Sequence, residues 1–172
     1  AKTEEILKKI SLNASIIRPG IVIGGGDNFL KKLLPIFKIS LFIPLFGSGE
    51  FEFEPVYVDD VAKAVEKIII SKLRGSHIYE LTGAQPFTYR SFYLHIARSL
   101  GVKRFYIPIP FFLAKAGAAI LEKTPINLIT REQLNLFQSN NLPSNVDKKF
   151  DDLGIIPQDI REIIKISIDK KT

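Results

Sequence analysis

Strand-type and helix-type patterns alternate along the first half of the chain. Short β-rich runs, the last of which closes at Gly83, are separated by helical spacing of apolar residues at residues 29–37 and 61–71. Beyond Gly83 helical patterns predominate. Such alternation predicts an α/β fold, because parallel strands need a long crossover that is usually a helix. We therefore expect an α/β lobe over residues 1–83 and a small, mainly helical lobe over residues 84–172.

The composition narrows the class of protein further. The 172 residues carry a formal net charge of +6 and 46% of them are hydrophobic, which excludes an intrinsically disordered chain. The absence of cysteine removes disulfides, thiolate metal ligands and thiol nucleophiles. The absence of methionine, with a helical pattern that starts at the first residues, predicts a fragment or a processed chain.

The basic residues occur mostly as pairs at the ends of elements, such as Lys31 and Lys32. Nucleic-acid binding favours Lys and Arg interleaved with aromatic residues, so we predict no nucleic-acid partner. The longest apolar stretch, residues 33–46, is too short to cross a bilayer, and we expect a cytoplasmic protein. A peripheral contact with the inner face of a membrane, through the apolar helix that starts at Phe111, stays open beside packing between the lobes.

Three glycines, Gly24 to Gly26, follow a short strand and precede a helix. Backbone N–H groups of such a loop bind phosphate at a helix N-terminus, but neither the G-x-G-x-x-G fingerprint nor a Walker pattern is present. A tight strand-to-helix turn explains the same glycines equally well. We expect Asp27 to cap the helix, and we expect Pro35 and Pro44 to end it.

The acidic and histidine residues form no complete metal or catalytic pattern. Glu50, Glu52 and Glu54 alternate along a predicted strand and share one face, which is usually solvated. Asp59 or Asp60 is predicted to be the N-cap of the next helix. The two histidines stand apart and no G-x-S-x-G elbow is present, so the local motifs predict no metal site and no nucleophile.

Several groups of residues occur in an order that resembles the second half of an extended or atypical short-chain dehydrogenase/reductase of the NAD-dependent epimerase/dehydratase family. They read AKTEE, IRPGIVIGGGDNF, PVYVDDVA, YELTG and FT (residues 1–5, 17–29, 55–62, 79–83 and 87–88). Within that family, four stretches are similar to the branch of nucleotide-binding accessory subunits of respiratory complex I and their bacterial homologues, namely DNF, PVYVDDVA, PIP and LITREQ (residues 27–29, 55–62, 108–110 and 128–133).

The resemblance implies the second half of a Rossmann-like doubly wound sheet plus a small, mainly helical substrate lobe, with NAD or NADP as the cofactor. Lys2 matches the lysine of the family's Tyr-x-x-x-Lys pair, which holds the nicotinamide ribose and lowers the pKa of the tyrosine. That tyrosine and the glycine-rich dinucleotide turn would lie before this chain. The strand end that passes the nicotinamide matches Pro19, Gly20, Ile21 and Val22.

Three further residues are implied to border the substrate cleft between the lobes, namely Gly25, Asp27 and Tyr57. Many sugar-nucleotide members carry an asparagine near the position of Ile21. Its absence here argues against sugar-nucleotide epimerisation.

The resemblance supports two functions. The first is an NAD(P)-binding epimerase/dehydratase-like oxidoreductase acting on a small-molecule substrate, with this chain supplying the nicotinamide side and the substrate lobe. The second is a non-catalytic NADPH-binding accessory or assembly subunit of respiratory complex I, the NADH:ubiquinone oxidoreductase, with respiratory subunits as partners. A stand-alone interaction module is the third alternative. We also expect the missing N-terminal half to be a partner, and the fragment to self-associate, because a cut sheet exposes apolar edges.

Overall fold

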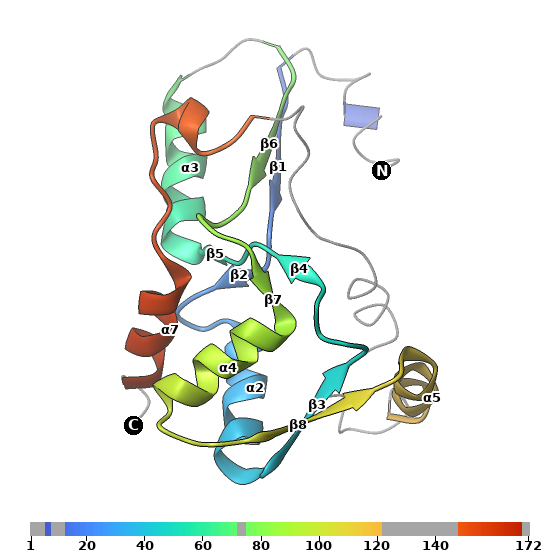
Figure 1. Cartoon of the computed structure of the whole chain (residues 1–172). Helices are drawn as coiled ribbons and strands as arrows, with labels where there is room; N and C mark the ends of the chain where they lie inside the picture. Colours follow the sequence, from blue (N-terminus) through green and yellow to red (C-terminus); the bar gives the residue numbers. More distant parts are fainter. Residues whose placement is uncertain (1–5, 8–12, 72–74, 122–147, 170–172) are drawn as a thin grey trace.

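The first parallel strand pair lies at one end of the molecule. The computed structural model describes residues 6–7, 13–71, 75–121 and 148–169 (Figure 1). β1 (Ser15–Pro19) and β6 (His77–Leu81) run parallel, with Ile17 opposite Tyr79. Lys148 adds a parallel bridge to Tyr79 on β6. Among the described residues, β6 is the one strand that pairs with β1.

Three further strand pairs follow. β2 (Val22–Ile23) and β5 (Val56–Tyr57) are parallel, β3 (Phe42–Phe46) and β8 (Phe105–Ile109) are parallel, and β4 (Glu52–Phe53) and β7 (Phe87–Thr88) are antiparallel. The alternating glutamates at residues 50–54 predict a longer strand than the structure contains, because β4 has only two residues. Together, the parallel pairs and the helices between them confirm the predicted α/β class.

Helix α2 (Asn28–Ile39) begins where the sequence predicts and ends later. The Asp27 carboxylate caps it by accepting from the backbone N–H of Leu30 at 2.6 Å. Pro35 lies inside the helix, so the expectation that it ends the helix is wrong. An internal proline costs about 3 kcal/mol, and complete burial of neighbouring side chains such as Leu34 and Phe37, roughly 2 kcal/mol each, offsets that cost.

Helix α3 (Val58–Ser71) begins directly after β5. Asp59 and Asp60 therefore lie in its first turn, and the prediction that one of them is the N-cap is wrong. Their charges still suit the positive end of the helix dipole. Helix α4 (Tyr89–Ser99) is capped by Thr88, whose hydroxyl oxygen accepts from the Ser91 N–H at 3.1 Å.

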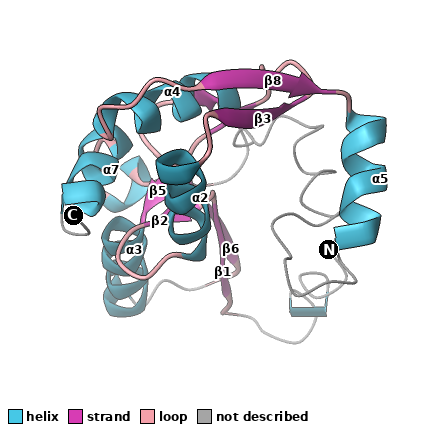
Figure 2. Ribbon diagram, turned by 90° about the horizontal axis from the view of Figure 1, so that it is seen from below, coloured by secondary structure: helices cyan, strands magenta, loops and turns pink. Residues whose placement is uncertain are grey.

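The remaining helices lie on opposite sides of the molecule. Helix α5 (Phe111–Leu121) follows β8 and stands apart from the other helices in Figure 2. The short 3-10 helix η1 (Asp151–Leu153) contacts α3, and α7 (Ile160–Asp169) packs on α4. None of the described helices is long and apolar enough to span a bilayer.

Two apolar cores hold these elements together, and both draw residues from either side of Gly83. The larger core joins Phe37 of α2 with Phe92 of α4 and Ile164 of α7, all completely buried. In the smaller core Tyr79 of β6 packs with Phe150, which precedes η1. The division into lobes at residue 83 stays a prediction, and side-chain packing continues across it.

Candidate functional site

The carboxyl ends of β1 and β6 meet the segment that leads into β5 at very close range. A Cβ atom on Gly20 would stand 2.5 Å from the carbonyl oxygen of Glu54, and one on Gly83 would stand 2.0 Å from that of Pro55. Glycine is therefore required at both positions for the three backbone segments to meet. Ligands of open α/β sheets bind beyond the carboxyl ends of strands, so this backbone junction lies where a cofactor is expected.

The four residues predicted to contact the nicotinamide are consecutive and form the turn from β1 to β2, namely Pro19, Gly20, Ile21 and Val22. The backbone of this turn is fixed on both sides. Gly20 donates its N–H to the Leu81 carbonyl at 3.0 Å, and the Ile21 carbonyl accepts from the Val56 N–H at 2.9 Å. The turn is thus rigid before any ligand arrives, while its contact with a nicotinamide stays a prediction.

The polar side chains beside this turn bind each other. The Thr82 hydroxyl donates to Glu54 Oε2 at 2.5 Å, and Arg18 Nη1 donates to Glu80 Oε1 at 3.3 Å. Both contacts join segments that are far apart in the chain. These two carboxylates therefore act in holding the strand ends together, which leaves the backbone as the main surface that the described residues offer to a cofactor here.

The glycine loop is closed by its own aspartate. Asp27 Oδ2 accepts from the Gly24 N–H at 3.3 Å while Oδ1 accepts from Leu30, and the Asp27 N–H returns to the Gly24 carbonyl at 3.2 Å. A carboxylate thus occupies the helix N-terminus where a phosphate would bind, which favours the tight turn over the phosphate cradle. Gly25 is exposed at the tip of the loop, with open space around it.

Replacing Asp27 with alanine is expected to lower the free energy of unfolding by about 1 to 2 kcal/mol, because the N-cap of α2 and the loop closure are lost together. Urea denaturation of the two proteins measures the difference. Asp27→Asn keeps an acceptor at the cap and should lose only a few tenths of a kcal/mol. An equal loss in both variants would show that the charge, rather than the cap, carries the effect.

Tyr57 lies beside the glycine loop. Its Cε2 atom would be 3.2 Å from a Cβ atom on Gly24. The hydrogen bond to Asp59, followed by burial and by the charges of Asp59 and Asp60, raises the pKa of Tyr57 above its ordinary 10.0. The phenol therefore stays protonated at neutral pH with its hydroxyl directed to Asp59. Roles for Tyr57, Gly25 and Asp27 in substrate binding stay predictions.

Asp60 is a buried tether, and no local pattern around it predicts its tertiary contact. Its side chain is only 1% exposed and accepts from the Gln158 N–H at 2.7 Å, from Gln158 Nε2 at 3.2 Å and from Lys63 Nζ at 3.1 Å. These bonds attach the segment before α7 to the first turn of α3. The pattern of two aspartates at a helix start is common, and the partner lies 98 residues away, so spacing alone does not reveal the contact.

Lys2, the predicted catalytic and ribose-binding residue, lies outside the described residues, and its role stays a prediction. Within the described ranges no group of three or more His, Asp or Glu residues is placed to hold a metal ion. His95 Nε2 lies 3.1 Å from the Arg161 carbonyl oxygen, a contact that joins α4 to α7. An open groove between α2 and the ends of α4 and α7 contains none of the predicted site residues; it is lined by Lys31, Leu34, Pro35, Lys38, Leu100 and Ile168.

The fold is shared with solved structures of epimerase and reductase proteins. The human epimerase family protein SDR39U1, crystallised with NADPH, superimposes with a TM-score of 0.64 at 18% identity, covering 90% of this chain and 48% of that one. A nucleoside-diphosphate-sugar epimerase from Staphylococcus aureus gives 0.66 at 15% identity, covering 95% and 56%. The chain therefore shares the α/β fold of these two proteins, and it corresponds to about half of each.

The sequence relatives are more specific. The chain is 32% identical over 173 residues to NADH dehydrogenase [ubiquinone] 1 alpha subcomplex subunit 9 of Arabidopsis thaliana, covering 94% of this chain and 42% of the relative. It is 27% identical to the NADH-ubiquinone oxidoreductase 40 kDa subunit of Neurospora crassa, covering 93% and 42%. The chain thus spans less than half the length of these relatives. A scan against protein-family models matched none. The chain is therefore similar in sequence to subunits of respiratory complex I, in agreement with the resemblance described above.

Proposed function

We propose that this chain forms the nicotinamide side of an NAD(P)-binding subunit that works within respiratory complex I. The observation that carries the proposal is the similarity to complex I subunits along 94% of the chain. The proposed cofactor is NADPH or NADH. Proteins with the same fold were crystallised with NADPH, NADP or NAD, which supports a nicotinamide dinucleotide as the ligand.

The backbone turn at residues 19–22 fits such a ligand. It lies at the carboxyl end of β1, it is fixed by hydrogen bonds to Leu81 and Val56, and Pro19 is exposed. A rigid turn of this kind binds a planar ring through backbone groups and van der Waals contact, without ordering the chain at the moment of binding. The residues that would hold the cofactor are therefore Pro19 to Val22, with Lys2 at the ribose.

The side chains around the turn favour binding over catalysis. Glu54 is bonded to Thr82, Glu80 to Arg18, and the Asp27 carboxylate to the backbone of its own loop. Each carboxylate thus stabilises the fold and is not held toward the turn as an acid or base. This supports the accessory subunit as the better of the two functions inferred from the sequence.

A second function, hydride transfer by an epimerase/dehydratase-like oxidoreductase, rests on Lys2. In the family that this chain resembles, that lysine lowers the pKa of a tyrosine, which then exchanges a proton with a carbonyl or alcohol. The nicotinamide would supply the hydride. Catalysis therefore needs the tyrosine four residues before Lys2, and reading the upstream sequence of the natural protein tests it directly: a phenylalanine there removes this alternative.

Within the part of the chain that the structure describes, β1 forms a ladder on one side alone, which supports the remainder of the subunit as a partner of this chain. Among the described residues the β1 ladder involves β6 alone, whereas β6 is paired on both sides, by β1 and by Lys148. Since the relatives are more than twice as long as the matched region, we propose that a strand from their other half pairs with β1 and completes the sheet.

Titration of the full-length natural protein with NADPH or NADH, followed by cofactor fluorescence, is expected to saturate for at least one of the two. Lys2→Ala should weaken that binding about tenfold, because a hydrogen bond from a charged group contributes about 1.5 kcal/mol. Lys8→Ala, a lysine from the same predicted helix, serves as the matched control and should bind normally. An unsaturable signal with both cofactors in a folded protein would overturn the proposal.

Association with complex I is tested separately by affinity purification of the tagged full-length protein from its own cells. Recovery of respiratory complex subunits is expected. If the protein binds cofactor but no respiratory subunit is recovered, the result favours the free oxidoreductase over the accessory subunit.

A further inference from the structure

The β3–β8 ribbon has one face in the core and an apolar face in solvent. Side chains alternate across a strand, and Ile43 and Leu45 point inward with exposures of 1% and 2%. Their neighbours point outward, where Phe42 is 54% and Phe105 is 63% exposed. The two rings lie side by side at 5.9 Å. An exposed strand face normally carries polar residues, so this apolar face needs a covering surface.

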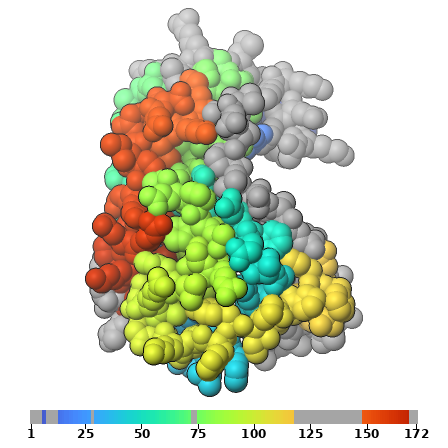
Figure 3. Space-filling view, viewed as in Figure 1, coloured from blue at the N-terminus to red at the C-terminus, as the bar shows by residue number. Residues whose placement is uncertain are grey.

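The apolar area extends along one margin of the molecule. We call it the ribbon surface, and it consists of Ile39, Leu41, Phe42, Phe105 and Ile107, which are between 46% and 87% exposed. Figure 2 shows the ribbon at the edge of the fold, with α2 on its inner side and no described element on its outer side. In the space-filling view of Figure 3 the end of α2, in blue, and the start of β8, in yellow, form the lower margin of the molecule.

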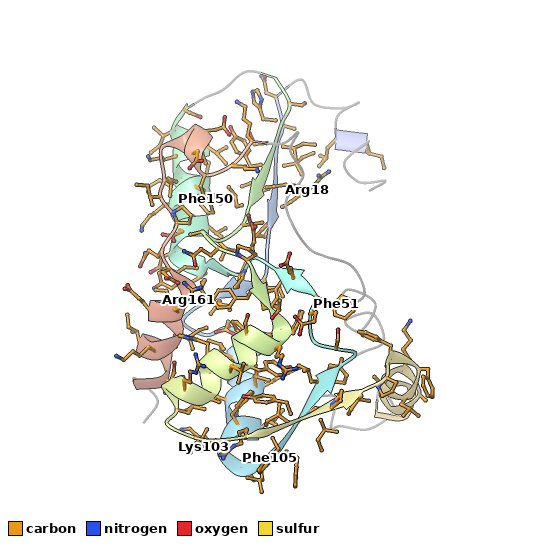
Figure 4. All side chains as sticks on the ribbon, in the orientation of Figure 1. Arg18, Phe51, Lys103, Phe105, Phe150 and Arg161 are labelled. Atoms are coloured by element: carbon orange, nitrogen blue, oxygen red, sulfur yellow. The ribbon has the colours of Figure 1, made fainter. Side chains whose placement is uncertain are left out.

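Cationic side chains border the ribbon surface. Figure 4 shows Lys103 next to Phe105 at this margin. Arg104 Nε donates to the Phe37 carbonyl at 2.7 Å and Nη2 donates to the Lys38 carbonyl at 3.3 Å, which holds the guanidinium at the end of α2. Its hydrogen-bond acceptors among the described residues are all neutral carbonyl groups, which do not balance its positive charge. Lys38 itself is exposed on the same turn of α2.

The two segments that contribute the ribbon surface carry basic residues and no acidic residue. Residues 28–49, which contain α2 and β3, carry three lysines and no acidic residue. Residues 81–121, which contain α4, β8 and α5, carry five Lys or Arg residues and no acidic residue. All 18 acidic residues of the chain therefore lie in other segments, so none of them adjoins the ribbon surface in sequence.

We propose that the ribbon surface docks on a membrane that contains anionic phospholipids. Phe and Ile side chains enter the boundary between headgroups and acyl chains, while the bordering Lys and Arg residues bind the phosphates. A protein partner fits less well, because lysine is depleted at protein interfaces whereas it borders this surface. The proposal does not rest on cofactor binding, and its test needs no nucleotide.

Cosedimentation of the full-length protein with vesicles provides the test. We expect binding to vesicles of phosphatidylcholine mixed with phosphatidylglycerol, and little binding to phosphatidylcholine alone. Lys103→Gln should weaken partitioning about fivefold, the effect of one cation near an anionic surface. The double substitution Phe42→Ser/Phe105→Ser should weaken it tenfold or more, because two exposed rings no longer enter the boundary.

Matched controls distinguish binding through the ribbon surface from nonspecific adsorption to vesicles. Ile69→Ser/Ile70→Ser removes two side chains of α3 that are 70% and 68% exposed, and Lys165→Gln removes a cation of α7. Both controls should bind vesicles as the unmodified protein does. Circular dichroism confirms that each variant is folded.

Three outcomes would overturn the proposal. Equal binding to both kinds of vesicle would show that anionic lipid is not recognised. Equal loss in the ribbon and control variants would place the contact elsewhere. Absence of vesicle binding, with a dimer that the Phe42→Ser/Phe105→Ser variant dissociates in size-exclusion chromatography, would assign the surface to a second copy of the chain.

Discussion

Replacing Asp60 with alanine is expected to lower the free energy of unfolding by about 3 kcal/mol. The carboxylate is 1% exposed and accepts three hydrogen bonds, two of them from Gln158. Its removal takes the acceptor from the Gln158 backbone N–H and from the Gln158 side-chain amide, and it detaches the segment that leads into α7. Urea denaturation followed by circular dichroism measures the loss.

Asp59→Ala is the matched control for this variant. Asp59 is exposed in the same turn of α3, so its removal costs only its interaction with the helix dipole and with Tyr57, about 1 kcal/mol or less. Lys63→Ala separates the ion pair from the bonds to Gln158 and should also cost little, since Lys63 is 55% exposed. If Asp60→Ala and Asp59→Ala lose the same free energy, Asp60 is not the tether described above.

Replacing Gly83 with alanine is expected to lower the free energy of unfolding by about 3 kcal/mol and to abolish saturable cofactor binding. The added methyl group would stand 2.0 Å from the Pro55 carbonyl oxygen and 3.0 Å from its carbonyl carbon. Both atoms belong to the backbone and cannot rotate away, so the strand end has to move. The turn that contains Gly20 rests on the same segment and would shift with it.

Gly25→Ala is the control for Gly83→Ala, because a Cβ atom there meets nothing within 4 Å. Its free energy of unfolding should stay within about 0.5 kcal/mol of the unmodified protein. Cofactor titration of both variants then separates the two effects. A Gly83→Ala protein that is as stable as Gly25→Ala and binds cofactor normally would show that the backbone segments at this junction are not tightly packed.

Local signals predicted much of the fold. Asp27 and Thr88 are caps whose effect depends on residues three positions away, so the sequence alone determines where α2 and α4 begin. The β-rich run that ends at Pro19 and the run that ends at Leu81 likewise became β1 and β6. The order of the motifs predicted both the fold and the similarity to complex I subunits.

Where α2 ends was decided by tertiary packing. Pro35 is a local signal to stop a helix, but the buried face of α2 continues to Phe37 and keeps the helix intact. The run Phe42–Phe46 shows neither helical spacing nor apolar/polar alternation. It becomes a strand because β8 pairs with it. Each of these outcomes depends on burial or pairing with distant residues, which periodicity does not encode.

The candidate site divides in the same way. The sequence alone determined that Pro19 and Gly20 end a strand and that Asp27 closes a glycine loop, because proline, glycine and a capping aspartate act through their own backbone. Only the tertiary structure decided that Gly20 and Gly83 meet the backbone at Glu54 and Pro55, and that Asp60 holds Gln158 from 98 residues away. Such contacts depend on how whole elements pack in space, and no local spacing of residues records that packing.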